Sequence, residues 1–408
     1  MRICLIIDDY LPDSIKVGAK MMHELGIEFI KRGHEVTVIT PHADLKSVYS
    51  ITKLDGVKIC YFRSGAVKNV GKVKRAINET LLSYNAWKAY KTYFKQNPYD
   101  MIIYYSPSIF WGPLVSKLKK LWDVPSYLIL RDFFPQWVID NGMIREGLPI
   151  ARYFRYFEKL NYAAADVIAI QSPKNLEWFK KTAKTGKLLD LLYNWAANEP
   201  VSTKNSYYHK KYGIEDKIVF FYGGNIGQAQ DMMNVVRLAK TLLNEKKAHF
   251  VLLGRGDEVK LVRHAIEEQK LDNMTLLPPV SQDEFKLMLA EFDIGLFSLH
   301  RDHRTHNFPG KLLGYMVQGK PILGSINPCN DLQETVEDAK AGFVTVNGED
   351  DLLKKNALEL LHNRDLREKM GANGKQLLHD LFSVESAADK ILAFYEKCNH
   401  SAPNLTGI

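Results

Sequence analysis

The sequence predicts an α/β protein built from two tandem, Rossmann-like, doubly wound domains that face a cleft. Short apolar runs alternate with amphipathic segments, as in residues 3–7, 21–31 and 35–40. This alternation is typical of parallel strands covered by helices. A second series of the same kind starts at Ile218, after a polar stretch over 196–212. A chain of 408 residues is long enough for two such domains.

The expected elements follow from hydrophobic periodicity and from glycine and proline breaks. In the first domain, 1–200, we expect strands over residues 3–7, 35–40, 57–62, 101–105, 127–130, 167–170 and 191–195. Helices are expected there over 21–31, 67–96, 113–121 and 152–162. In the second domain, 201–382, we expect strands over 218–222, 250–253, 274–277, 294–296, 322–323 and 342–346. Its helices are expected over 233–243, 259–269, 283–291, 350–362 and 364–382, followed by a terminal helix over 383–398.

The composition is that of a folded protein, with 46% hydrophobic and 25% charged residues. The apolar run after Met1 is too short for a signal peptide, and no run is long enough to span a bilayer. The four cysteines are far apart and form no metal-type pair, so reduced thiols are expected. These features favour a cytoplasmic location.

The positive charge of the chain is concentrated in its first half. Residues 1–200 carry 29 Lys and Arg against 19 Asp and Glu, a net charge of +10 (29 minus 19). The remainder carries 26 against 28, a net charge of −2 (26 minus 28). Such an imbalance indicates an anionic partner, acidic lipid or nucleic acid, although solubility alone would also account for it. No RNA-binding module is recognisable, so nucleic acid is not expected.

One basic region, residues 66–95, is also rich in aromatic side chains. Its cations are Lys68, Lys72, Lys74, Arg75, Lys88 and Lys91, and its apolar residues are Leu81, Leu82, Tyr84, Trp87, Tyr90, Tyr93 and Phe94. This mixture fits a surface that rests on an anionic membrane. The alternative, two ordinary helices with aromatic core faces, is slightly favoured by the same pattern.

The segment 305–324 predicts an anion site. Asn307 is a natural N-cap, Pro309 suits a first helical turn, and Lys311 adds a mobile cation beside the helix N-terminus. Free backbone N–H groups and the helix dipole favour a phosphate there. The alternative is a helix cap without a ligand.

Two glycine-containing turns follow strands of the second domain. Gly224 and Asn225 lie in the first, where glycine lets a phosphate or sugar approach the backbone closely. Arg255 lies in the second, and its guanidinium suits phosphate oxygens. Turns of this kind are common, and an exposed Arg255 without a ligand is the alternative.

Charged residues also end two strands of the first domain. Asp132 follows Arg131 and could orient a hydroxyl or act as a base, although a structural ion pair would look the same in sequence. Asp13, Lys16 and Gly18 lie in the first loop and are expected to contact an acceptor or a phosphate.

The histidines His300, His303 and His306 recur at every third position. They could bind a metal, but no carboxylate or cysteine completes the set, so contact with anions is the favoured interpretation. No Asp-x-Asp pair occurs in the loops, and neither a metal nor a cofactor is expected.

Together these motifs resemble the GT-B glycosyltransferases of the retaining family four. The resemblance rests on 33–40, 222–227, 253–256 and 305–324, and these stretches occur in the family's order. It implies that the second domain binds a nucleotide sugar, the first binds the acceptor, and the terminal helix crosses back to the first.

The resemblance also assigns roles to residues. The diphosphate would contact Gly310, Lys311 and Leu312, with Gly224, Asn225 and Arg255 nearby and Asn307 and Phe308 in the preceding loop. Backbone at Pro279 and Val280 would meet the uracil. Arg131, Asp132 and Lys311 are the expected catalytic group.

The chain departs from the family's pattern at its usual charged positions. The two glutamates eight positions apart are replaced by His306 and Gly314, and the usual Arg and Lys are replaced by Asn225 and Asp231. A narrower subgroup, bacterial O-antigen transferases of N-acetyl-L-fucosamine, shares these departures. It is similar over 8–13, 16–20, 130–137 and 307–316.

This subgroup implies a UDP-N-acetyl-L-fucosamine donor and an undecaprenyl-diphosphate-linked acceptor, used at the inner face of the cytoplasmic membrane. A UDP-sugar 2-epimerase of GT-B fold, a non-catalytic nucleotide-sugar-binding subunit and a metal hydrolase using the three histidines are the alternatives.

Overall fold

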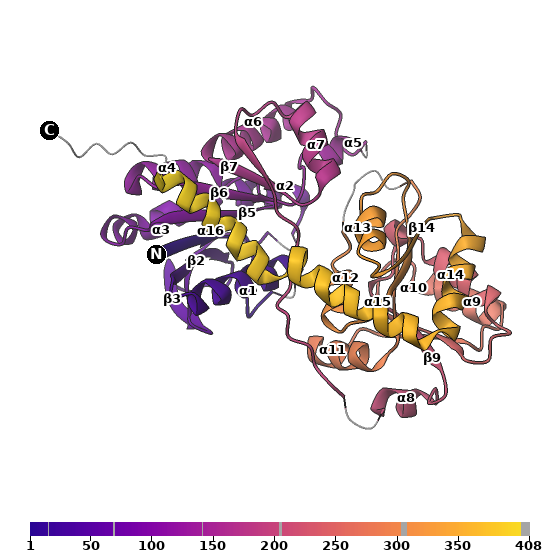
Figure 1. Cartoon of the computed structure of the whole chain (residues 1–408). Helices are drawn as coiled ribbons and strands as arrows, with labels where there is room; N and C mark the ends of the chain where they lie inside the picture. The colour runs from indigo at the N-terminus through magenta and orange to yellow at the C-terminus, as the bar shows by residue number, and fades with distance from the viewer. Residues whose placement is uncertain (15, 68–69, 141, 204–205, 303–307, 401–408) are drawn as a thin grey trace. The chain divides into compact units, whose positions relative to one another are not determined.

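The computed structural model describes residues 1–14, 16–67, 70–140, 142–203, 206–302 and 308–400. The chain forms two compact units, shown in Figure 1. Unit 1 comprises Met1–Tyr193 together with the chain from Val384, and unit 2 comprises Asn194–Ser383. The first unit therefore ends at Tyr193 rather than at residue 200, because its last strand ends at Leu191.

Unit 1 contains an eight-stranded sheet in the order β3-β4-β2-β1-β5-β6-β7-β8. Every neighbouring pair is parallel except β3 and β4. The strands are β1 (Arg2–Ile6), β2 (Glu35–His42), β3 (Tyr49–Leu54), β4 (Val57–Arg63), β5 (Met101–Ser106), β6 (Ser126–Leu130), β7 (Val167–Ile170) and β8 (Leu188–Leu191). The strand expected over 191–195 corresponds to β8, which begins and ends earlier in the chain, at Leu188 and Leu191.

The helices that accompany this sheet are α1 (Val17–Lys31), α2 (Lys72–Thr80), α3 (Leu82–Gln96), α4 (Gly112–Trp122), α5 (Gln136–Asp140), α6 (Pro149–Ala164), α7 (Pro173–Thr182) and α16 (Val384–His400). Helix α1 begins at Val17 and not at Met21, so Gly18 lies in a helix rather than in a loop. The apolar pattern missed this first turn because Val17 is exposed.

The aromatic side chains of α3 belong to the core of unit 1. Tyr90 and Phe94 are fully buried, and Trp87 and Tyr93 pack against the same cluster. Helix α3 is therefore the core helix that the sequence slightly favoured. Helix α2 differs, because it presents apolar side chains to solvent, with Val73 75% exposed.

The terminal helix α16 packs against α1, as Figure 1 shows. Ile391 and Ala388 of α16 are buried. Arg32 at the end of α1 donates to the Asp389 carboxylate and to the carbonyl oxygen of Glu385. The last helix of the sequence is therefore a structural part of the first unit.

Unit 2 contains a six-stranded, all-parallel sheet in the order β11-β10-β9-β12-β13-β14. The strands are β9 (Ile218–Asn225), β10 (Ala248–Arg255), β11 (Met274–Leu277), β12 (Ile294–Ser298), β13 (Ile322–Ile326) and β14 (Gly342–Val346). Strand β9 extends to Asn225 and not to Tyr222 alone, since Gly224 and Asn225 continue the ladder with β10. The predicted glycine turn is thus partly strand.

The helical segments of unit 2 are α8 (Tyr207–Tyr212), η1 (Gln228–Gln230), α9 (Met232–Thr241), α10 (Val259–Glu268), α11 (Gln282–Glu291), α12 (Lys311–Val317), α13 (Leu332–Asp338), α14 (Asp350–His362), α15 (Arg364–Leu377) and η2 (Leu378–Phe382). The expected helix over 364–382 is divided, because its last turn, η2, is π-helical. Among the described residues, no helix is long and apolar enough to cross a membrane.

Candidate functional site

The strand order of unit 2 places the two glycine-containing segments at a topological switch point. Strands β10 and β11 continue from β9 in one direction, and β12, β13 and β14 lie on its other side. The loops after β9 and β12 therefore diverge, which is where open α/β sheets bind ligands. Gly224 and Asn225 end β9 at this edge, and both are exposed.

Glycines allow the ends of β9 and β10 to lie unusually close together. A Cβ atom on Gly254 would lie 1.8 Å from the carbonyl oxygen of Gly224, and one on Gly256 would lie 2.0 Å from that of Ile226. Gly254 also has a φ of +158°, which other residues rarely adopt. These glycines are therefore required for packing, and they place Arg255 directly beside Asn225.

Lys311 supplies a buried cation at this edge of the sheet. Its Nζ lies 3.3 Å from the centre of the Tyr222 ring, a cation–π contact. The same Nζ is buried and has no hydrogen-bond partner among the described residues. Burial holds the pKa of Lys311 well below its usual range. An anionic ligand would supply the missing partner.

Lys311 also lies close to Gly224. A Cβ atom at residue 224 would lie 3.6 Å from the Lys311 Nζ. The backbone at Gly224 and the Lys311 ammonium group are thus two of the predicted diphosphate contacts that the structure brings together.

Helix α12 is fixed to the sheet through Tyr315. The Tyr315 hydroxyl donates to the carbonyl oxygens of Leu296 (2.7 Å) and Phe221 (3.2 Å). Its ring lies where a side chain on Gly295 would be, since a Cβ there would be 2.4 Å from the ring. This anchor holds Lys311 in place at the start of the helix.

The start of α12 differs from the sequence-based expectation. The helix begins at Lys311 with Gly310 as N-cap, so Pro309 precedes the first turn. The amide of Leu312 donates to the Pro309 carbonyl oxygen, which shows a turn before the helix. Phe308 is buried against Phe382 at a ring separation of 5.2 Å. The expected N-cap, Asn307, lies outside the described residues.

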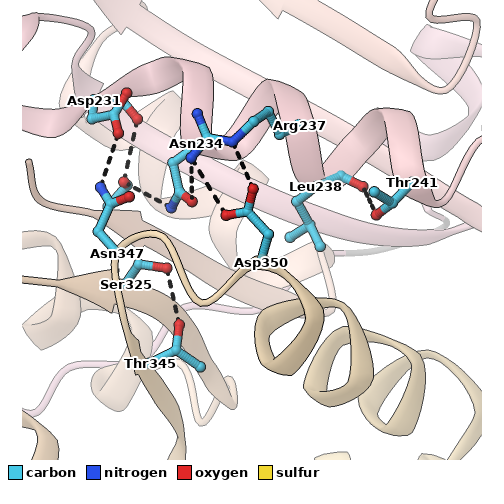
Figure 2. Close-up of polar contacts among 10 residues, drawn as sticks. Asp231, Asn234, Arg237, Leu238, Thr241, Ser325, Thr345, Asn347 and Asp350 are labelled. Carbon is cyan, nitrogen blue, oxygen red and sulfur yellow. Dashed lines mark hydrogen bonds and ion pairs between the residues drawn. The ribbon is translucent and has the colours of Figure 1, made fainter. Parts of the chain in front are cut away.

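A buried polar network ties together the segments that follow β9, β12 and β14 (Figure 2). Asn347, which is 2% exposed, donates to the Asp231 carboxylate (3.0 Å) and to the carbonyl oxygen of Leu299 (2.9 Å). Asn234 donates to the Ser298 hydroxyl (3.1 Å). Asp231, at a family position that usually carries a cation, is thus a structural acceptor here.

The outer end of this network is an ion pair. Arg237 donates to the Asp350 carboxylate (2.8 Å) and more weakly to the Asn234 side chain (3.4 Å), as Figure 2 shows. The pair connects α9 to the start of α14, so the network also links these two helices to each other.

The remaining second-domain candidates lie at the same carboxyl edge of the sheet. Arg255 ends β10 and is exposed, and Pro279 and Val280 follow β11. A Cβ atom on Gly314 would lie 3.2 Å from Leu289 of α11. The position that usually holds a ribose-binding glutamate therefore faces a packed helix.

Arg131 has a structural role in unit 1. It is 7% exposed, and its guanidinium donates to the carbonyl oxygens of Leu192 and Tyr193. Burial lowers the pKa of Arg131 to about 10. These two hydrogen bonds connect the end of β6 to the chain after β8, and the catalytic role expected for Arg131 stays a prediction.

Asp132 is more accessible than its neighbour, and its surroundings disfavour the carboxylate. Its pKa is raised by partial burial and by the nearby Asp8 carboxylate. Arg131 and Asp132 are the expected pair at the end of β6. Of the two, Asp132 is therefore the residue suited to orient a hydroxyl group or to accept a proton.

The first-loop candidates mostly contact their own unit. Lys16 pairs with Asp9 at 3.4 Å, and Asp13 lies 3.3 Å from a ring nitrogen of His42. Gly18 packs against Tyr105, since a Cβ there would lie 2.8 Å from the Tyr105 hydroxyl oxygen. Gly18 thus allows α1 to approach β5.

The histidine motif is only partly described. His300 is half exposed, and its ring lies 3.9 Å from Asp302, whereas His303 and His306 lie outside the described residues. Within the described part of the chain, no group of three or more His, Cys, Asp or Glu could hold a metal ion.

Several site residues were not predicted from the sequence. Four residues that hold the segments of the site in place have no distinctive spacing in the sequence. They are Tyr222, Tyr315, Asn234 and Asn347. The signal available was their position directly at or after buried strands, where parallel sheets gather functional loops.

Comparison with known proteins agrees with this fold. Residues 205–377 match the family model described as "Glycosyl transferases group 1". Solved structures of the same fold include sucrose-phosphate synthase from Thermosynechococcus elongatus (TM-score 0.71, 14% identity, 98% of this chain and 100% of that chain). The glycosyltransferase WaaG, involved in lipopolysaccharide biosynthesis, is another (TM-score 0.62, 15% identity, 95% and 99%). The fold is GT-B, and the match to the family model lies within unit 2.

Curated relatives are more similar in sequence than these solved structures, at 22–25% identity. "Probable glycosyltransferase WbjE" of Pseudomonas aeruginosa is 25% identical over 53% of this chain and 54% of its own length. The N-acetyl-alpha-D-glucosaminyl L-malate synthase of Bacillus anthracis is 23% identical over 57% and 58%. The matches to these two relatives span little more than half of their length. "Putative colanic acid biosynthesis glycosyl transferase WcaI" of Escherichia coli is 22% identical over 78% and 82%.

Proposed function

We propose that the chain is a retaining glycosyltransferase that transfers a sugar from a UDP-sugar to a lipid-linked saccharide. The observation that carries this proposal is the buried Lys311 Nζ near Gly224 at the switch point of unit 2, which has no hydrogen-bond partner among the described residues. A buried ammonium group without a partner is costly, and it persists in proteins mainly where function needs it. A diphosphate would supply both the charge and the acceptors.

In this reaction the bond between the sugar's anomeric carbon and the UDP oxygen breaks, and a bond to an acceptor oxygen forms. The acceptor proton passes to the departing phosphate on the same face of the sugar. The protein stabilises the negative charge that develops on UDP, and Lys311 with nearby backbone donors is suited to this role. The exposed Arg255 beside Asn225 adds a second cation at the same edge.

The proposed donor is UDP-N-acetyl-L-fucosamine, or a UDP-sugar with a similar amino sugar, and the proposed acceptor is an undecaprenyl-diphosphate-linked saccharide. The subgroup resemblance over 307–316 and 130–137 supports this choice. Two similar proteins, the colanic acid transferase WcaI and the lipopolysaccharide transferase WaaG, are named for surface polysaccharides, which supports the same product class here. The structure of HepE from Anabaena in complex with UDP and glucose is a solved example of the fold with such ligands.

A lipid-linked acceptor also implies contact with a membrane surface. Unit 1 holds the basic part of the chain, and α2 exposes Val73 and Ile77 one turn apart, 75% and 55% exposed. Lys74 and Arg75 lie between them and are exposed. Apolar side chains flanked by cations fit an anionic lipid surface. Sedimentation with vesicles containing anionic lipid, compared with neutral vesicles, tests this part of the proposal.

The function is tested by a donor screen. Purified protein is incubated with UDP-N-acetyl-L-fucosamine, UDP-N-acetylglucosamine, UDP-glucose or a GDP-sugar, together with a lipid-diphosphate N-acetylhexosamine. Mass spectrometry should detect a lengthened lipid with the fucosamine donor. UDP binding without product from any donor would favour a binding subunit, and release of an epimerised sugar would favour a 2-epimerase.

A further inference from the structure

A groove of about 510 Å³ lies between α6 and α7 of unit 1. Its walls come from α6, from α7 and the chain after it, and from the segment after β6. Phe133 is one of the lining residues, and it directly follows Asp132. The volume falls within the range of about 300–1,000 Å³ typical of small-molecule sites.

Aromatic rings form much of the groove surface. The Trp178 ring packs against Phe133 with centroids 4.8 Å apart, and Phe133 stacks on Phe179 at 5.8 Å and 23°. Phe179 is buried, whereas Trp178 remains 37% exposed. Trp178 thus presents a ring that is held by its neighbours and still accessible. A sugar ring, apolar on its C–H face and polar at its edge, suits such a surface.

Polar groups in the groove are held in fixed positions. Arg155 donates to Glu158 (3.0 Å), to Glu146 (3.2 Å) and to the side-chain oxygen of Gln136. The Tyr162 hydroxyl donates to the other oxygen of Glu158 (3.2 Å). A ligand that uses these groups would find them already oriented, which reduces the entropic cost of binding.

The charge of the groove is positive. Four cations line it, Arg155, Lys159, Lys184 and Lys187, against the single carboxylate of Glu158. Arg155 is paired, and Lys187 donates to the carbonyl oxygen of Ala163 (2.9 Å). Among the described contacts, Lys159 and Lys184 form no hydrogen bond or ion pair. These two ammonium groups are therefore available to an anion.

We propose that the groove between α6 and α7 binds a saccharide that carries a phosphate group, with the sugar ring on Trp178 and the phosphate near Lys159 and Lys184. Phe133 lines the groove and directly follows Asp132, so the bound group is assigned to the acceptor. This assignment to the acceptor rests on the proposed function. The binding itself does not, because every residue involved lies in unit 1.

The test uses the six tryptophans of the chain as reporters. Full-length protein labelled with ¹⁵N-tryptophan gives one indole N–H signal per ring, and the signal lost in Trp178→Phe belongs to Trp178. N-acetylglucosamine 1-phosphate is then titrated in. The Trp178 signal should move and saturate, and the other five should remain in place.

Lysine substitutions test the contribution of charge to binding. Replacing both lysines, Lys159→Gln with Lys184→Gln, should weaken binding of the probe by about tenfold or more. Lys180→Gln is the matched control, since Lys180 is exposed on α7 and does not line the groove. It should leave the affinity unchanged.

Two further probes define the ligand. Inorganic phosphate and unphosphorylated N-acetylglucosamine should each bind more weakly than the phosphosugar. A farnesyl-diphosphate-linked N-acetylglucosamine that binds more tightly would identify a lipid-linked source, and equal affinity would identify the phosphosugar as sufficient. The same shift with phosphate alone, movement of several indoles together, or no effect of the lysine substitutions would overturn the proposal. UDP binding, measured on the same samples, reports separately on unit 2.

Discussion

At the residue scale, the site in unit 2 depends on the buried ammonium group of Lys311. Lys311 lies on the Tyr222 ring, and its Nζ is buried without a hydrogen bond among the described residues. Such an arrangement reduces the stability of the free protein in favour of ligand binding. This interpretation leads to two predictions about stability, one at neutral pH and one across pH.

Lys311→Met should raise the melting temperature of the free protein. Methionine keeps the apolar stem against Tyr222 and removes the buried charge, so a gain of about 1 kcal/mol, or roughly 2–4 °C, is expected. Differential scanning calorimetry measures it, with the exposed Lys260→Met on α10 as control. A melting temperature lower than that of the unsubstituted protein would show that the ammonium group is already satisfied.

The stability advantage of Lys311→Met should shrink as the pH rises. Burial holds the pKa of Lys311 well below 10.5 in the folded protein, whereas the unfolded chain titrates near 10.5. Between those values the unfolded chain binds more protons, so the free energy of unfolding of the unsubstituted protein rises with pH. Urea unfolding of both proteins at pH 7 and pH 9.5 measures the difference. A constant difference would contradict a depressed pKa.

At the element scale, the network of Asp231, Asn234 and Asn347 holds three loops in register. Replacing Asn347 with alanine leaves the Leu299 carbonyl and the Asp231 carboxylate without their shared donor. A loss of about 1–3 kcal/mol in the free energy of unfolding is expected from these buried groups. Urea denaturation measures it.

The matched control for this substitution is Asp350→Ala, at the exposed end of the same network. Both partners of the Arg237–Asp350 pair are partly exposed, so a loss below about 1 kcal/mol is expected. Equal losses in the two variants would show that the buried hydrogen bonds are not the part that holds the loops.

Regular elements were predictable where apolar periodicity was strong. Both parallel sheets and the alternation with helices follow from the sequence, and β11 and β14 were placed at their observed bounds. Strand β3 was missed because it is an edge strand with exposed Tyr49 and Ile51. Elements without a buried face leave little pattern to read.

The candidate site was predicted in part. The glycine and lysine positions of the site could be predicted from the sequence. Few residue types allow a ligand to approach the backbone closely or place a cation in a loop. The burial of Arg131 was not predictable, since a buried arginine bound to carbonyl oxygens and an exposed one look alike in sequence. The start of α12 was misplaced because Asn307 and Gly310 are both acceptable caps.

At the scale of the whole molecule, the last helix joins the first unit. Ile391→Ala on α16 should destabilise unit 1 by about 2–4 kcal/mol, because Ile391 is fully buried. Hydrogen exchange read by mass spectrometry should show faster exchange in β1 and β5 and no change in β12–β14. Glu396→Ala, exposed on the same helix, is the control. Faster exchange confined to unit 2 would contradict the division into units.

The most direct test of the account is calorimetric titration with UDP of the unsubstituted protein, Lys311→Met and Lys260→Met. We predict saturable binding to the unsubstituted protein and to Lys260→Met. Binding to Lys311→Met should be weaker by about tenfold or more, equivalent to about 1.4 kcal/mol. Equal affinity in all three proteins, or no binding of UDP to the unsubstituted protein, would contradict the claim that Lys311 holds the donor's diphosphate.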